Sequence, residues 1–436
     1  MTNIALVVLD TLRYDAFEEF FDWLPGVRFT NVFSPGHYTI PAHAGIFTGQ
    51  YPSEVGTHAK SEDLTYEEPV LAEVLSRSGY TTRGFTANVL LSPWNNWDRG
   101  FDEYRLGWRV RAASPETFNW SETLNNLGER SKITRYLLST CKCILSESKT
   151  IPSLNIAWHL KQSEHDGGPE ALEFVSNTSF GDNEFLFLNL MEAHLPYRPP
   201  TDYQTVDLEL FDDTSESILG GDTNCDVLRQ AYNDSVRYLS DTYNQIFTQL
   251  KENFDYILTV SDHGELFGEH NARAHWHGVY PELVHVPLSI WNDESEIKYR
   301  DEPASLIDLH QTILAMANFG ESPSSRGRDL RTNLGNSTWL TESNGLRPSR
   351  IDSLQADGFS QETISQYDTP LFGIGTQNYY GWQTVDSFEE CGDGDLENPV
   401  MQIENKRSTM KTAPSESSKT KINRSAQSQL EDLGYL

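Results

Sequence analysis

The chain has 436 residues, 37% of them hydrophobic, so it can bury a large core and has room for one large domain and a smaller one. Its 64 acidic residues against 33 basic ones give a net charge of −31, which opposes binding to nucleic acid. No run of 18 apolar residues occurs, so we expect no membrane span.

The N-terminus enters an apolar run directly, without the charged region and cleavage site of a signal peptide, so we expect a cytoplasmic protein. The acidic residues are spread along the chain, which favours a halophilic organism such as an archaeon with a salt-rich cytoplasm, because salt screens their repulsion. An ordinary acidic protein is the alternative. Four cysteines lack four-ligand zinc spacing and are expected to be free thiols: Cys141, Cys143, Cys225 and Cys391.

The first predicted element is a buried parallel strand over residues 3–9, a continuous apolar run that ends at Asp10. Open α/β sheets bind ligands at the carboxyl ends of their strands, so Asp10 is a candidate site residue. The alternative is a strand-end carboxylate that only caps the next helix.

The next segment combines a hydroxyl residue, a proline and a histidine as Thr39, Pro41 and His43. Pro41 predicts the opening of a helix, because proline suits the first helical position. Thr39 would lie just ahead of that helix, where unpaired N–H groups and the positive dipole end attract an anion. Thr39 is therefore a candidate nucleophile for phosphoryl or sulfuryl transfer; an ordinary helix cap, with His43 packed at the surface, is the alternative.

Helical spacing of apolar residues predicts a helix within 64–79, and a short strand over 80–88 ends at Asn88. Residues 105–180 are expected to form helices and loops over the sheet, where substrate selection takes place. Residues 185–191 form a second buried strand.

His194 follows this second strand, and a strand-end histidine is more often structural than catalytic. A long amphipathic helix is predicted over 227–250. The third buried strand, 256–261, ends in Asp262 and His263.

The rest of the chain continues the alternation with a strand over 286–291 and a helix over 304–318. Residues 402–429 are rich in Ser, Thr, Lys and Gln and predict an irregular stretch, and residues 430–436 predict a short docked helix. We therefore expect an α/β fold with a doubly wound, mostly parallel central sheet over residues 1–330, and a small C-terminal α+β subdomain over residues 331–436.

Parallel strands bring Asp10, His194, Asp262 and His263 to one edge of the sheet, with Thr39 at a nearby helix start. Two carboxylates, an imidazole and a hydroxyl oxygen suit one divalent metal ion: Mn²⁺, Zn²⁺, Mg²⁺ or Ca²⁺. Such an ion would activate the Thr39 hydroxyl and neutralise the charge of an anionic ester.

Five segments, in this order, resemble the sulfatase family of the alkaline phosphatase superfamily: Leu9-Asp10-Thr11-Leu12-Arg13, residues 39–49, Gly79-Tyr80 with Asn88, Ala193-His194-Leu195-Pro196-Tyr197 and Ser261-Asp262-His263-Gly264-Glu265. The resemblance covers residues 3–320 and the extreme C-terminus. It implies an alkaline phosphatase-like fold and a metal held by Asp10, Asp262 and His263, with Thr39 at the nucleophile position and in reach of the metal.

The same resemblance implies that His194 contacts the ester oxygens or assists the leaving group, and that Asn88 adds a polar contact to the substrate. His275 or His277 falls where relatives carry a basic residue near the transferring group, and the sequence does not decide between them. His43 stands at the position of the arginine that supports the nucleophile in sulfatases, and it is a candidate substrate-binding residue.

The departures from the family concern the nucleophile. Sulfatases carry Cys or Ser in a Cys/Ser-x-Pro-x-Arg pattern and oxidise it to formylglycine, whereas this chain has Thr39, Pro41 and His43. Oxidised threonine would be a ketone, so the hydrated-aldehyde mechanism does not apply. Thr11 replaces an acidic residue of many calcium-binding sulfatases, and His263 favours a transition-type metal. These features resemble the superfamily's phosphodiesterases and phosphoglycerol transferases, which use an unmodified threonine.

We therefore expect a metal-dependent hydrolase or transferase of sulfate or phosphate esters, with phosphate esters or diesters favoured. A true sulfuric ester hydrolase, similar to arylsulfatases, is one alternative. A catalytically silent relative that binds a sulfated or phosphorylated glycan is another. The expected partner is a small anionic ester, with a glycan or lipid headgroup as candidates.

Overall fold

The computed structural model describes residues 2–413 except 115, 121–122, 125–126, 128–130, 147, 163–165, 208–213, 221–223, 294–295 and 321–323. The predicted helix over 430–436 and the stretch from residue 414 onwards lie outside the described residues. Within the described chain, no helix combines the length and apolar composition needed to cross a membrane.

A central sheet of eight strands has the order β11-β2-β10-β7-β1-β6-β4-β5. Only β10 is antiparallel to its neighbours. The expected α/β class with a mostly parallel central sheet is confirmed. The strands are β1 (Ile4–Leu9), β2 (Val27–Phe29), β4 (Thr81–Thr86), β5 (Glu103–Leu106), β6 (Glu184–Leu190), β7 (Tyr256–Val260), β10 (Leu288–Trp291) and β11 (Lys298–Arg300).

The central strands are aligned so that their carboxyl ends meet. Ile4 pairs with Phe185 of β6 and with Tyr256 of β7, and this register continues without a break along β1. Every residue of β1 and β6 is buried. The residues that follow these three strands therefore lie at the same edge of the sheet.

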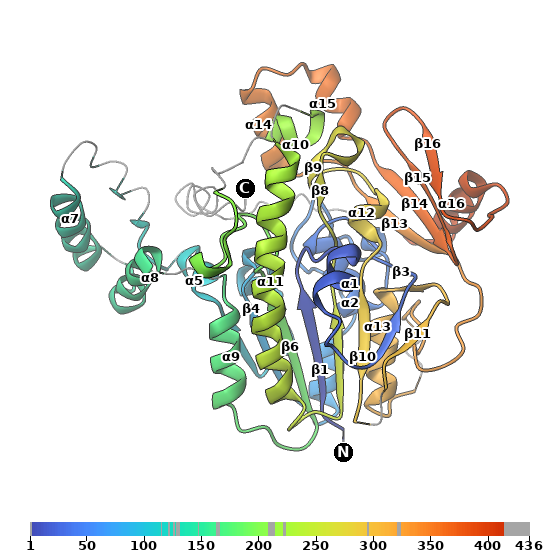
Figure 1. The fold of residues 1–436 in the computed structure, drawn as a ribbon, viewed down its shortest axis with the longest axis horizontal. Coiled ribbons are helices and arrows are strands. Elements are labelled where there is room, and N and C mark those ends of the chain that lie inside the picture. Colours follow the sequence, from blue (N-terminus) through green and yellow to red (C-terminus); the bar gives the residue numbers. More distant parts are fainter. Residues whose placement is uncertain are drawn as a thin grey trace.

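Helices cover both faces of the sheet, as alternating side chains of a buried strand require. Ala5, Val7 and Leu9 pack in one core with α1 (Tyr14–Phe20), α9 (Gly168–Asn177) and α11 (Cys225–Leu250). The other side chains of β1 pack in a second core with α2 (Thr39–Thr48), α4 (Leu71–Arg77) and α13 (Ile307–Met316). In Figure 1, α9 and α11 lie in front of the sheet.

Three predicted helices have different bounds in the structure. α2 begins at Thr39, so Thr39 is its first residue and extended Tyr38 precedes it; Pro41 fits within the first turn, where N–H groups have no helical partner. The helix predicted within 64–79 is limited to α4. The segment predicted as a helix from residue 304 starts with β12 (Ala304–Ser305), which pairs with β3 (Val32–Phe33).

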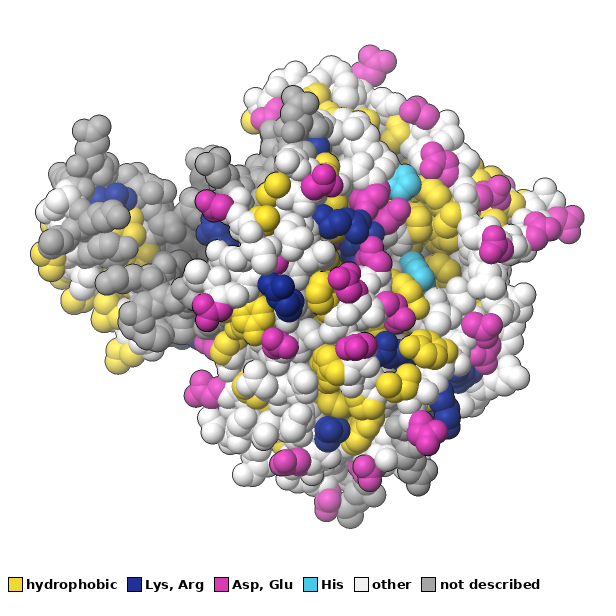
Figure 2. All heavy atoms as spheres, in the orientation of Figure 1, with side chains coloured by type: hydrophobic (Ala, Val, Ile, Leu, Met, Phe, Trp, Pro, Cys, Tyr) yellow, Lys and Arg dark blue, Asp and Glu magenta, His cyan; other side chains and the backbone are white. Residues whose placement is uncertain are grey.

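Residues 105–180 only partly cover the sheet, contrary to the prediction. α9 packs on it, but α7 (Lys132–Leu145) and α8 (Thr150–Gln162) project away from it (Figure 1). Leu145 and Ile151 are 85% and 76% exposed, and Figure 2 shows hydrophobic side chains at the outer edge of this lobe.

The remaining elements of the first 330 residues are short. They are α3 (Pro52–Val55), α5 (Trp108–Ala112), α10 (Thr214–Leu219), α12 (Pro281–Val284), β8 (Leu266–Phe267), β9 (Arg273–Ala274) and 3-10 turns at Val89–Leu91, Pro93–Asn95, Thr201–Tyr203 and Glu269–Asn271.

The C-terminal part forms a small antiparallel sheet with helices, in agreement with the predicted α+β character. Its elements are β13 (Trp339–Ser343), α14 (Pro348–Ala356), α15 (Gln361–Tyr367), β14 (Leu371–Thr376), β15 (Tyr379–Gln383), β16 (Phe388–Cys391) and α16 (Pro399–Ser408). The irregular stretch predicted from residue 402 is wrong up to residue 408, because buried Ile403 anchors α16 to the apolar core of this sheet. The domain boundary at residue 330 stays a prediction.

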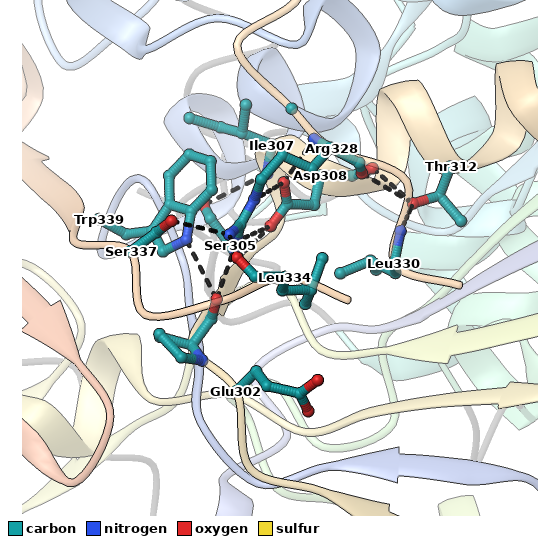
Figure 3. Close-up of polar contacts among 12 residues, drawn as sticks. Glu302, Ser305, Ile307, Asp308, Thr312, Arg328, Leu330, Leu334, Ser337 and Trp339 are labelled. Carbon is teal, nitrogen blue, oxygen red and sulfur yellow. Dashed lines mark hydrogen bonds and ion pairs between the residues drawn. The ribbon is translucent and has the colours of Figure 1, made fainter. Parts of the chain in front are cut away.

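A buried ion pair holds α13 to the segment that leads into the C-terminal sheet. Figure 3 shows the Asp308 carboxylate facing the Arg328 guanidinium, with Nη2 at 3.1 Å from Oδ2. The backbone N–H of Arg328 also donates to Oδ1 at 2.6 Å, and Thr312 accepts from the N–H of Leu330. The Asp308 side chain is fully buried, so these donors satisfy a carboxylate that water does not reach.

Candidate metal and nucleophile site

Three potential metal ligands meet at the carboxyl edge of the sheet. Asp10 follows β1, and Asp262 and His263 follow the neighbouring β7. All three are 0% exposed, and one ligand atom from each lies within 4.8 Å of the others. The register of the two strands, set by their apolar residues, brings these side chains together.

Polar side chains hold both oxygens of Asp10. Asn88 and Asn189 donate to Oδ2 at 2.9 and 3.0 Å, and the Thr11 hydroxyl donates to Oδ1 at 2.9 Å. Burial alone would raise the pKa of Asp10, but nearby histidines and the two amides outweigh it and lower the pKa to about 2. Asp10 is therefore a carboxylate.

Asp262 has one satisfied and one unsatisfied oxygen. Its Oδ1 accepts from the N–H groups of Thr11 (3.2 Å) and His263 (3.0 Å), whereas none of the described residues donates a hydrogen bond to Oδ2. Burial and the charge of Asp10 raise the pKa of Asp262 well above its usual range. Thr11 has a φ of 65°, rare for a β-branched residue, and this strained conformation places its N–H on Asp262.

His263 presents one nitrogen to both carboxylates. Its Nδ1 lies 2.9 Å from the carbonyl oxygen of Gly264, which can only accept, so Nδ1 donates there and Nε2 is the nitrogen that can offer a lone pair to a cation. Nε2 is 3.6 Å from Asp10 Oδ1 and 3.6 Å from Asp262 Oδ2. Two buried carboxylates, one with an unpaired oxygen, and an imidazole lone pair directed at both are what a divalent cation requires. The residues fit a metal.

Residue 264 is a glycine because the backbone of Glu282 lies too close to leave room for a side chain. A Cβ at this position would lie 2.0 Å from the carbonyl oxygen of Glu282, so only glycine fits. Its backbone φ is not positive, and the residue is required by space and not by a left-handed turn.

Thr39 lies beside this group of ligands at the start of α2. Its Oγ1 accepts from Asn88 Nδ2 at 3.1 Å and lies 3.5 Å from His263 Nε2. The residue is 1% exposed but lines a narrow pocket, so a small ester that enters the pocket can reach its hydroxyl.

His43 lies behind Thr39, away from the pocket. Its Nδ1 is 2.9 Å from the carbonyl oxygen of Thr39 and 3.6 Å from Asp262 Oδ2, and its ring packs edge-on against Trp97 and Phe187. Burial lowers its pKa to about 4. The structure therefore places His43 as a neutral support of α2, whereas the sequence predicted contact with the substrate.

The structure distinguishes the two candidate histidines by position. The ring of His275 lies 5.0 Å from that of His194 and 4.5 Å from that of His263, and His194 and His275 both line the pocket with Thr39. His277 packs instead against the ring of Tyr367 and is not among the pocket residues. Burial lowers the pKa of His194 and His275 below the usual range.

Sequence reasoning missed three residues of the site. Glu265 accepts from the Tyr197 hydroxyl at 2.6 Å and lies 2.9 Å from His275 Nδ1, so it orients the His275 ring. Asn189 supports Asp10. The available signals were the position of Glu265 and Tyr197 inside two of the motifs named above, and the polar Asn189 within the apolar run of residues 185–191.

The sequence is similar to known sulfatases. A family model described as Sulfatase matches residues 3–319. The chain is 22% identical over 319 residues to the uncharacterized sulfatase YidJ of Escherichia coli (strain K12), a match that covers 67% of this chain and 61% of that protein. It is 25% identical over 397 residues to an arylsulfatase of Clostridium perfringens (strain 13 / Type A), covering 77% and 79%.

The fold is similar to those of several solved structures. The phosphonate monoester hydrolase SpPMH from Silicibacter pomeroyi superposes with a TM-score of 0.64 at 18% identity, covering 94% of this chain and 96% of that one. BT4656, solved with its substrate D-glucosamine-2-N,6-O-disulfate, superposes with a TM-score of 0.59 at 13% identity, covering 99% and 98%. These likenesses concern the fold and confirm the expected alkaline phosphatase-like class.

Proposed function

The chain belongs to the sulfatase family, and we propose that it is a metal-dependent hydrolase or transferase that cleaves phosphate esters with the Thr39 hydroxyl as nucleophile. The observation that carries the proposal is the position of Thr39 Oγ1, held by Asn88 at 3.1 Å beside the Asp10, Asp262 and His263 group. A hydroxyl placed in this way at the base of a pocket is available to an entering ester.

Asp10, Asp262 and His263 would hold one divalent cation, which supplies Lewis-acid polarisation of the hydroxyl and of the ester oxygens. Asn88 donates to Thr39 Oγ1 and so stabilises the negative charge that develops there. Oγ1 forms a bond to phosphorus while the bond to the alcohol oxygen breaks, and the alcohol leaves with a proton. Water or an acceptor alcohol then displaces Thr39 and restores its hydroxyl.

His194 and His275 line the pocket beside Thr39 and are the groups placed to exchange protons with the leaving alcohol and the attacking water. Glu265 fixes the ring of His275 through Nδ1, which leaves Nε2 for this exchange. His277, which packs on Tyr367, has no part in the proposed reaction.

The preference for phosphorus rests on the nucleophile. Sulfatases proper depend on formylglycine, and a threonine side chain cannot form that aldehyde. An unmodified threonine hydroxyl is also the nucleophile of the superfamily's phosphodiesterases and phosphoglycerol transferases, which this chain resembles in that respect. A true sulfuric ester hydrolase is the second candidate, favoured by the similarity to the arylsulfatase of Clostridium perfringens.

The proposal is tested with a panel of aryl sulfates, phosphate monoesters, diesters and phosphonate esters, assayed with the wild type and with Thr39→Ala. We expect the highest turnover on a phosphorus ester and its loss in Thr39→Ala. Undiminished turnover in the variant would remove Thr39 as the nucleophile, and faster sulfate turnover would reverse the preference between the bonds.

A catalytically silent relative is separated from an enzyme by metal analysis. After dialysis against Mn²⁺ we expect about one ion per chain, and none in Asp262→Asn if its unpaired Oδ2 is a ligand. A wild-type protein that takes up no ion would contradict the metal-dependent mechanism.

A further inference from the structure

The pocket above Thr39 continues beyond the groups that the proposed reaction uses. It is a narrow recess that is open to solvent, and its lining includes Thr39, His194 and His275. Its lining also includes Tyr38, Trp276 and Arg347. A substrate larger than the transferred group can contact these three side chains.

Arg347 is the only lining residue with a permanent positive charge. It is 8% exposed and immediately precedes α14 of the C-terminal part. Its Nε donates to Glu62 Oε1 at 2.5 Å, which fixes the guanidinium plane. Among the described residues no other hydrogen bond of this guanidinium is found, so Nη1 and Nη2 remain available to a ligand.

Tyr38 offers a second polar group in the lining of this pocket. The residue is only 5% exposed, and its buried hydroxyl has no hydrogen-bond partner among the described residues. An unsatisfied buried hydroxyl is costly in a folded protein unless a ligand or water pairs with it. The residue directly precedes Thr39, so the backbone that positions the nucleophile also positions this hydroxyl.

Trp276 contributes an aromatic ring to the lining of the pocket. The guanidinium carbon of Arg350 lies 3.4 Å from the centre of its ring, and the ring of His275 lies 4.8 Å away. The indole is therefore held in place by stacking, and it presents an apolar surface to a sugar or aromatic ring.

We propose that Arg347 and Tyr38 form a subsite for a second anionic group, so that the substrate is an ester of a sugar or aryl alcohol that itself carries a carboxylate, phosphate or sulfate. The guanidinium donates two parallel hydrogen bonds to such a group and the phenol donates a third. In a protein with a net charge of −31, a dianionic substrate needs a local cation to offset repulsion. This inference rests on the proposed function and names the substrate class of the same site.

The test compares phenyl phosphate with 4-carboxyphenyl phosphate. In the wild type we expect the carboxylated ester to have the higher kcat/KM. In Arg347→Gln the ratio of the two kcat/KM values should fall about 10- to 100-fold, chiefly through KM of the carboxylated ester. Arg347→Lys should restore part of the ratio, and Tyr38→Phe should lower it severalfold.

The matched control is Arg326→Gln. Arg326 also pairs with a glutamate, Glu54, but is not among the pocket residues, and its loss should leave the ratio unchanged. A ratio that does not respond to Arg347→Gln, or responds equally to Arg326→Gln, would overturn the subsite.

A binding measurement separates this inference from the reaction itself. Phenylphosphonate and 4-carboxyphenylphosphonate, which have no cleavable ester bond, are titrated into the wild type and Arg347→Gln by calorimetry. If the subsite exists, the carboxylated ligand binds more tightly only while Arg347 is present, whether or not Thr39 is the nucleophile. Equal affinities of the two ligands for the wild type would contradict it.

Discussion

Asn88 and Asn189 both donate to the same oxygen of Asp10, but they differ in one contact. Nδ2 of Asn88 also donates to Thr39 Oγ1 at 3.1 Å, whereas no hydrogen bond between Asn189 and Thr39 is found among the described residues. Both side chains are buried, at 1% and 0% exposure, so neither amide is free to exchange its partner for water. Substituting each asparagine in turn can therefore distinguish the effect of a hydrogen bond to Asp10 from the effect of a hydrogen bond to the nucleophile.

Replacing Asn88 by Ala should lower kcat about 100-fold or more with little change in KM, because a donor aimed at developing negative charge contributes mainly in the transition state. Steady-state kinetics on the best ester of the panel measure this effect.

Asn189→Ala is the matched control. It removes a donor of the same length from Asp10 Oδ2 and leaves the Thr39 contact intact. If both variants lose kcat to the same extent, Asn88 acts through its hydrogen bond to Asp10 and not through its hydrogen bond to Thr39.

Elements far apart in the sequence are joined by buried carboxylates. Asp308, in the first turn of α13, pairs with Arg328, and Glu342 of β13 accepts from the backbone and hydroxyl of Ser53 in α3 at 2.9 and 2.8 Å. Both carboxylates are almost fully buried, at 0% and 1% exposure. Each fixes an element of the C-terminal part, or the segment leading to it, against the helices around the central sheet.

Asp308→Ala should lower the free energy of unfolding by about 3 kcal/mol, because it leaves Arg328 and several N–H groups without their acceptor. Denaturant unfolding measures the change. Asp329→Ala, which breaks the more exposed pair with Arg331, should cost less than about 1 kcal/mol. Equal losses would show that the Asp308 network does not hold α13 in place.

Glu342 should make stability depend on pH. Burial raises its pKa from 4.5 to about 7, so the folded state prefers the protonated acid. Its contribution is fully present below pH 4.5 and is lost as the pH rises through about 7. Between these values the wild type should lose up to about 3 kcal/mol relative to Glu342→Gln.

The measurement is the difference in free energy of unfolding between wild type and Glu342→Gln at several pH values, which cancels the contribution of all other groups. A difference that stays constant from pH 4.5 to 7 would show that Glu342 titrates normally in the folded protein.

At the scale of the whole molecule the dominant feature is charge. Acidic side chains are distributed over the face seen in Figure 2 and do not gather in one patch. With a net charge of −31 their mutual repulsion acts on the compact state much more than on the expanded chain. Screening by salt should therefore favour folding.

The melting temperature should rise by several degrees between about 0.1 and 1 M KCl, as the Debye length falls from about 10 to 3 Å, and then change little. Thermal unfolding followed by circular dichroism measures this dependence. A melting temperature that does not change with KCl over this range would identify the chain as an ordinary acidic protein.

The local pattern of apolar and polar residues was sufficient to predict many of the strands and helices. The apolar runs before Asp10 and Asp262 predicted buried strands, and the long helix over 227–250 was correct to within two residues at its start. These elements are determined by periodicity and burial along the chain itself. The bounds of α4 and the helical residues 402–408 were wrong because contacts distant in sequence decide where a short helix ends.

By itself, the sequence determined which residue types lie at the carboxyl ends of the central strands, since the apolar runs of the buried strands mark where each strand ends and its polar residues follow. Tertiary structure alone decided which of them share a site. The position of His275 in the pocket with Thr39, the contact of His277 with Tyr367, the inward position of His43 and the presence of Arg347 in the same pocket depend on packing between distant segments. No local pattern carries that information, because side chains that meet only through the packing of the whole chain leave no periodic trace in it.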